Sequence, residues 1–318
     1  MEIPHLAFLS VIFGLMLLSF PIGMFVVFHT DIGDTINFAL PFGILDKFEH
    51  LDLGFSYNME IGDAFVAIWS LYAIFFTIAM LGPKTGFIKA MSSIFSHGSL
   101  DARSNYMVAI TKWLSITILV SVIINFVQEG FGITIDPPAV ENDLIQFFYV
   151  SLSPLIEEAG FRLLLIGLPL FAFYGYNSNI KHLLQSLWNP SSALHIHDIK
   201  KAVILIVVVG VLFGFAHISS DMSWSEGKFA QAAAGGMILG WVYFRFGFVA
   251  ALMIHWATNY FVFSYVNFLA QVNNMTVDAA FSHPLISTIE ALLLISGSLS
   301  VAMIIAKYWY SRKSILEI

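Results

Sequence analysis

The chain has 318 residues, of which 58% are hydrophobic and only 11% are charged, and its formal net charge is −7. A soluble domain carries about 25% charged residues, so this composition excludes a water-facing globular protein. The acidic balance gives no sign of nucleic-acid binding, and the absence of cysteine excludes disulfides and thiol catalysis.

The apolar residues come in blocks that are long enough to cross a bilayer, which takes about 20 residues per helix. Backbone polar groups in lipid must be satisfied within the segment, so these blocks are predicted to be helices. Eight are predicted, at roughly 6–28, 63–82, 106–127, 144–174, 200–218, 229–246, 247–268 and 285–306. The predicted fold is therefore all-α, with eight transmembrane helices in a single transmembrane domain over residues 1–318.

Lysine and arginine gather in alternate connections, and loops of this kind face the cytoplasm. The basic connections hold Lys84, Lys89, Arg103, Lys181, Lys200, Lys201, Arg245, Lys307, Arg312 and Lys313. The remaining connections are acidic, and their only basic residues are Lys47 and Lys228. This pattern predicts an integral, multi-pass membrane protein with both termini in the cytoplasm, which agrees with an even number of helices.

Three of the predicted helices carry ionisable or amide side chains well inside their apolar stretch, where each charge costs about 3 kcal/mol. These candidate site residues are Glu157, Glu158, Arg162, His217, His255 and Asn259. Together they define a predicted catalytic core over residues 150–260. Such residues are retained inside a membrane when they are compensated and serve a task.

Helical spacing sorts these residues by face. Glu158 and Arg162 are four residues apart, so they are predicted to form a charge-assisted pair on one face. Glu157 points about 100° away and lacks such a partner on its own helix. His255 and Asn259 share a face by the same spacing, and Phe213 lies one turn before His217.

One free carboxylate, two imidazoles and one amide are the groups needed to hydrolyse a peptide bond without a nucleophilic side chain. A glutamate and a histidine can polarise a water molecule, while an amide and a second histidine can bind an oxyanion. The chain contains no Gly-x-Ser-x-Gly motif that would indicate a serine nucleophile.

Other interpretations of these residues stay open. The Glu158–Arg162 pair and a lone membrane histidine are often structural, and buried Glu, His and Arg also form the relays of a proton-coupled transporter. A non-catalytic protein that binds a membrane partner is a third reading.

The pair His195 and His197 is expected to lie in a solvated loop rather than to bind a metal. Small residues spaced by four, such as Gly210 with Gly214, predict helix-packing surfaces, as do Ala232, Gly236 and Gly240.

The ordered motifs Glu-Glu-x-x-x-Arg, Phe-x-x-x-His and His-x-x-x-Asn resemble the CAAX protease and bacteriocin-processing family, also called the Abi or type II CAAX prenyl endopeptidase family. The resemblance covers about residues 150–260 and implies an eight-helix intramembrane glutamate protease. It implies that Glu157 is the base and that His217 helps it. It also implies that His255 and Asn259 bind the oxyanion, while Glu158 and Arg162 hold the site in shape.

The resemblance further implies a membrane-embedded or lipidated protein as substrate, including prenylated CAAX-type proteins. No cofactor is expected: two histidines and a glutamate can bind zinc, but a water held by a carboxylate and an imidazole needs no metal. The loop charges place the site toward the outer face, because His217 lies about 25 Å along a helix that starts inside. The prenyl-protease branch of the family opens to the cytosol instead.

Overall fold

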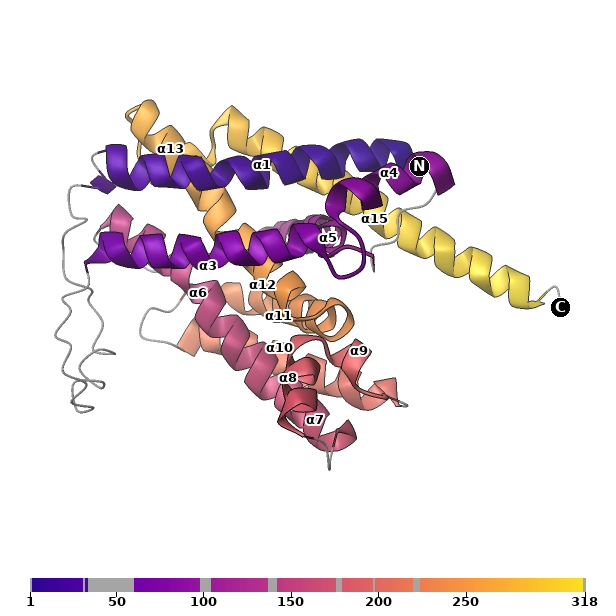
Figure 1. The fold of residues 1–318 in the computed structure, drawn as a ribbon. Coiled ribbons are helices and arrows are strands. Elements are labelled where there is room, and N and C mark those ends of the chain that lie inside the picture. Colours follow the sequence, from indigo (N-terminus) through magenta and orange to yellow (C-terminus); the bar gives the residue numbers. More distant parts are fainter. Residues whose placement is uncertain are drawn as a thin grey trace, which may run out of the picture.

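The computed structural model describes residues 2–30, 32–33, 60–97, 104–136, 142–175, 179–196, 198–219 and 224–316 (Figure 1). Apart from isolated bridges, such as that between Pro83 and Asn105, the regular elements of these residues are helices. In chain order they are α1 (Glu2–His29), α3 (Ile61–Leu81), α4 (Phe87–His97), α5 (Tyr106–Gly130), α6 (Asp143–Glu158), the π-helix η2 (Ala159–Gly167), α7 (Leu168–Tyr174), α8 (Ile180–Trp188), α9 (Pro190–Ala193), α10 (Ile199–Ser219), α11 (Lys228–Phe246), α12 (Phe248–Trp256), the π-helix η3 (Ala257–Phe261), α13 (Val262–Val272), α14 (Val277–Phe281) and α15 (Pro284–Leu316).

Six helical stretches of the described residues are long and apolar enough to cross a membrane: His5–His29, Ile61–Leu81, Tyr106–Gly130, Ile199–Ser219, Phe248–Val272 and Pro284–Trp309. The chain is therefore an all-α, multi-pass membrane protein, as predicted. The blocks expected at 144–174 and 229–246 are also helical, as α6–η2–α7 and as α11. They are not among the six stretches, so a total of eight crossings stays a prediction.

The short helix α12 forms the centre of the fold. All of its residues from Phe248 to Trp256 are buried, and it packs against α3, α5, α6 and α11. Figure 1 shows it between α1, α3 and α15 on one side and α7 to α10 on the other. A polar side chain on α12 therefore faces the interior of the bundle and not lipid, as an intramembrane site requires.

Asparagine caps fix where two of the core helices begin. The Asn105 side chain accepts hydrogen bonds from the backbone N–H groups of Met107 and Val108, at the start of α5. Asn142 does the same for Leu144 and Ile145 at the start of α6. These side chains satisfy N–H groups that have no partner within the helix.

The small residues of α10 and α11 let these two helices pack closely, as their spacing predicts. A Cβ atom at Gly210 would lie 2.9 Å from the Met237 backbone nitrogen, and one at Gly214 would lie 2.9 Å from the Phe229 carbonyl oxygen. Gly236 faces the Gly210 backbone in the same way. This contact places the end of α10, with His217, beside the start of α11.

We expect Gly210→Val to destabilise the protein by roughly 1–3 kcal/mol, because the added side chain forces α10 away from α11. Gly235→Val is the matched control, since a Cβ at Gly235 meets nothing within 4 Å. Thermal unfolding of both variants in detergent measures the difference. Equal melting temperatures for the two variants would contradict the close packing.

Candidate active site

A buried ion pair forms where α6 passes into the π-helix η2. Glu158 is the last residue of α6, and its Oε2 accepts a hydrogen bond of 3.0 Å from Nε of Arg162. Both side chains are fully buried. The pair expected from the four-residue spacing is therefore confirmed, and the guanidinium also lies 5.0 Å from the centre of the Phe213 ring on α10.

The second oxygen of Glu158 reaches a different helix. Nδ1 of His255, on α12, lies 2.9 Å from Glu158 Oε1. Because a carboxylate paired with an arginine is an acceptor, the imidazole donates this hydrogen bond. Glu158 thus joins α6, η2 and α12, a link that the spacing of the sequence does not reveal.

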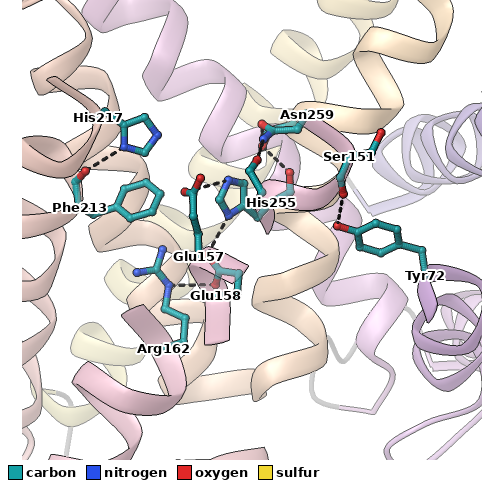
Figure 2. Close-up of polar contacts among 11 residues, drawn as sticks. Tyr72, Ser151, Glu157, Glu158, Arg162, Phe213, His217, His255 and Asn259 are labelled. Atoms are coloured by element: carbon teal, nitrogen blue, oxygen red, sulfur yellow. Dashed lines mark hydrogen bonds and ion pairs between the residues drawn. The ribbon is translucent and has the colours of Figure 1, made fainter. Parts of the chain in front are cut away.

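The carboxylate of Glu157 lies between the His217 and His255 side chains (Figure 2). Its Oε2 lies 3.8 Å from Nε2 of His255, which is too far for a direct hydrogen bond, and has no hydrogen-bond partner. About 27% of the side chain is exposed, whereas Glu158 is fully buried. The two adjacent carboxylates therefore differ: both oxygens of Glu158 are hydrogen-bonded within the protein, whereas Oε2 of Glu157 is buried and has no hydrogen-bond partner.

His217 stands on the other side of Glu157, near the end of α10 (Figure 2). Its Nδ1 lies 2.9 Å from the Phe213 carbonyl oxygen. A carbonyl oxygen only accepts, so Nδ1 carries the proton and Nε2 of the neutral ring is an acceptor. His217 also interacts electrostatically with Glu157, although no direct hydrogen bond joins them. The structure therefore brings the unpartnered acid and both imidazoles into one region.

Asn259 lies on η3, one turn after His255. Its Nδ2 donates a hydrogen bond of 3.1 Å to Oγ of Ser153, on α6. Thr258 Oγ1 donates to the His255 carbonyl oxygen at 2.8 Å. An amide nitrogen has two N–H donors, so one remains available at the site. Sequence reasoning selected Asn259 but missed Ser153, which carries no distinguishing motif.

A tyrosine outside the motifs also contacts the site helix. The Tyr72 hydroxyl, on α3, donates a hydrogen bond of 2.8 Å to the backbone carbonyl of Ser151 (Figure 2). Ser151 lies within α6, which continues without a break through Pro154 to Glu158. The contact helps to fix α6 one to two turns before the glutamates.

The site residues do not form an evident metal centre. Nδ1 of each imidazole bonds to a protein oxygen, a Glu158 carboxylate oxygen in one case and the Phe213 carbonyl in the other, which leaves Nε2 of each ring as the nitrogen that could bind a metal. Within the described ranges, no three His, Asp or Glu side chains are grouped so that they could hold a metal ion. His197 lies outside the described residues, so the predicted solvated loop with His195 and His197 stays a prediction.

The fold and the cluster together define a class: a multi-pass membrane protein with a buried glutamate–histidine centre shared by α6, α10 and α12. Residues 142–261 match the family model described as Rce1-like, type II CAAX prenyl endopeptidase. The chain thus carries a domain of the Rce1-like type II CAAX prenyl endopeptidase family over these residues, which include all six candidate site residues. No curated protein and no solved structure matches the chain.

We expect Arg162→Met to destabilise the protein by about 3–5 kcal/mol, because it leaves the charge of Glu158 buried without its cation. The double variant Glu158→Gln with Arg162→Met should be less destabilised, since it removes that charge as well. Thermal unfolding in detergent compares the three proteins. A melting temperature of Arg162→Met equal to that of the wild type would contradict a structural role for the pair.

Proposed function

We propose that the protein is an intramembrane endopeptidase that hydrolyses a peptide bond with a water molecule activated by Glu157 and His217. The family domain supports a CAAX-type hydrolase. The observation that carries the assignment to residues is the free Glu157 Oε2, 3.8 Å from His255 Nε2 and without a hydrogen-bond partner. A water molecule can contact both atoms at ordinary hydrogen-bond distances.

In the proposed reaction, the water attacks the carbonyl carbon of the scissile bond while Glu157 accepts a proton from it. The Nε2 acceptor of His217 orients the same water, since Nδ1 holds the ring proton on the Phe213 carbonyl. Glu157 then delivers this proton to the leaving nitrogen, and the second proton of the water passes from the new acid to the amine. The products are a new carboxylate and a new ammonium group, and no covalent intermediate with the protein forms.

The tetrahedral intermediate carries a negative oxygen, and His255 and Asn259 are the proposed donors to it. The Nδ1–H of His255 is held on Glu158, so that a proton on Nε2 can be donated to the oxyanion. Asn259 uses one N–H for Ser153 and offers the other. Donors fixed before the reaction stabilise a developing oxyanion without reorganisation, and Glu158, Arg162 and Ser153 supply that fixing.

The proposed substrate is a membrane-embedded or lipidated protein, including prenylated CAAX-type proteins, because the matching family is described by that activity. We further propose eight crossings with both termini in the cytoplasm, a single transmembrane domain over 1–318, and a catalytic core at 150–260. Charge in the loops is the support for this orientation.

We expect Glu157→Gln to reduce cleavage of a fluorogenic prenylated peptide by about 10²–10⁴-fold, since glutamine cannot accept the proton from water. The variant should unfold at the same temperature as the wild type, because Glu157 makes no hydrogen bond that stabilises the fold. Glu129→Gln, a change at an exposed residue near the end of α5, is the matched control and should retain activity. A Glu157→Gln enzyme that works at full rate would refute the assignment.

We also expect strong chelators such as EDTA and 1,10-phenanthroline to leave the cleavage rate unchanged. The reaction as proposed uses a carboxylate and imidazoles, and the described residues offer no three-ligand group. Initial rates before and after prolonged dialysis against the chelator measure this. Loss of activity that returns on adding Zn²⁺ would show that the water is activated by a metal instead.

A further inference from the structure

A lysine ammonium lies beside the candidate site without a carboxylate partner. Lys228 is the first residue of α11 and is only partly exposed. Its Nζ donates a hydrogen bond of 2.6 Å to Gln231 Oε1 and lies 4.1 Å from the centre of the Trp224 ring. Both partners are neutral, and among the described residues no Asp or Glu forms an ion pair with it.

Lys228 is linked to the site through the loop before α11. The Trp224 backbone N–H donates a hydrogen bond of 3.0 Å to the carbonyl oxygen of His217. The ammonium interacts electrostatically with Glu157, and the His217 imidazole interacts electrostatically with both Lys228 and Glu157. The cation therefore lies within electrostatic reach of the groups that are proposed to activate water.

The loop that carries Lys228 is firmly attached to the end of α5. Gln128 Nε2 donates a hydrogen bond of 2.8 Å to the Gly227 carbonyl, and the Asp136 N–H donates one of 2.8 Å to Ser225 Oγ. Gly227 packs so closely on the Thr134 carbonyl that a Cβ there would overlap it. The lysine thus has a fixed position, unlike a lysine on a solvated loop.

A lysine at this position is stabilised further when it binds an anion. A positive charge at the first residue of a helix is opposed by the helix dipole. A partly buried ammonium also loses hydration that two neutral partners replace only in part. Of its three N–H donors, Gln231 takes one. The remaining donors can receive an anionic group that arrives with the substrate.

We propose that Lys228 is a specificity-determining residue that binds the C-terminal carboxylate of the substrate. The inference rests on the proposed peptidase function. It adds the residue that recognises the C-terminal segment of the substrate, which the cleavage releases. A carboxylate held beside Glu157 places the scissile bond within a few residues of the chain end. A substrate that ends at Lys228 fits against the attached loop, whereas a longer chain has to continue past it.

The test uses two internally quenched farnesylated peptides that differ only in ending as a carboxylate or as a carboxamide. With the full-length protein in detergent, kcat/KM should favour the carboxylate peptide by about tenfold or more, as expected for a hydrogen bond between charged groups. In Lys228→Gln the ratio should fall to about one, and Lys228→Arg, which keeps the cation, should retain most of it. Lys181→Gln changes an exposed lysine and should leave the ratio unaltered.

A Lys228→Gln enzyme that keeps the wild-type ratio would overturn the proposal, as would a wild type that cleaves both peptides equally well. Wild type that cleaves neither peptide would instead refute the peptidase function itself. Should Lys228→Gln fail to fold, the wild type is tested for inhibition by the C-terminal product peptide, added either as the free acid or as the amide. The free acid should then inhibit at least tenfold more strongly than its amide, and equal inhibition would exclude recognition of the carboxylate.

Discussion

A carboxylate that is fully removed from water must have each of its oxygens occupied, and Glu158 meets this requirement by joining three helical segments. Arg162 on η2 binds one oxygen and His255 on α12 binds the other. A charge buried at this depth is tolerated only with such compensation. The same contacts therefore stabilise the fold and set the orientation of the His255 ring, and they leave the neighbouring Glu157 as the carboxylate that is free to act.

Other parts of the fold serve this arrangement. The fully buried α12 keeps His255 away from lipid, and close glycine packing between α10 and α11 brings His217 and Lys228 to the same end of the bundle. Each π-helical segment begins beside one site residue and contains another: η2 follows Glu158 and contains Arg162, while η3 begins two residues after His255 and contains Asn259. π-Helical turns are frequent at functional sites because they change the direction of side chains along an otherwise regular helix.

The sequence predicts most of the helices and one contact of the site. Long apolar blocks locate helices because lipid leaves the backbone no other partner, and four-residue spacing predicts the Glu158–Arg162 pair because it depends on one helix only. The bond from Glu158 to His255 and the one from Asn259 to Ser153 depend on how α6 packs against α12 and η3. Residue spacing along one helix carries no information about contacts between helices. The π-helices were also missed, since Ala159–Gly167 and Ala257–Phe261 have ordinary helical compositions.

The two hydrogen bonds of Glu158, to Arg162 and to His255, are the contacts on which the site depends. Solid-state NMR of the protein in lipid bilayers can measure the one to His255. With ¹⁵N-labelled histidine and ¹³C-labelled glutamate, we expect a dipolar coupling between His255 Nδ1 and a glutamate carboxyl carbon, of the strength that a direct hydrogen bond gives. The coupling should disappear in Glu158→Gln, which identifies the residue. A folded wild-type protein in which no histidine Nδ1 couples to a glutamate carboxyl carbon would contradict the account.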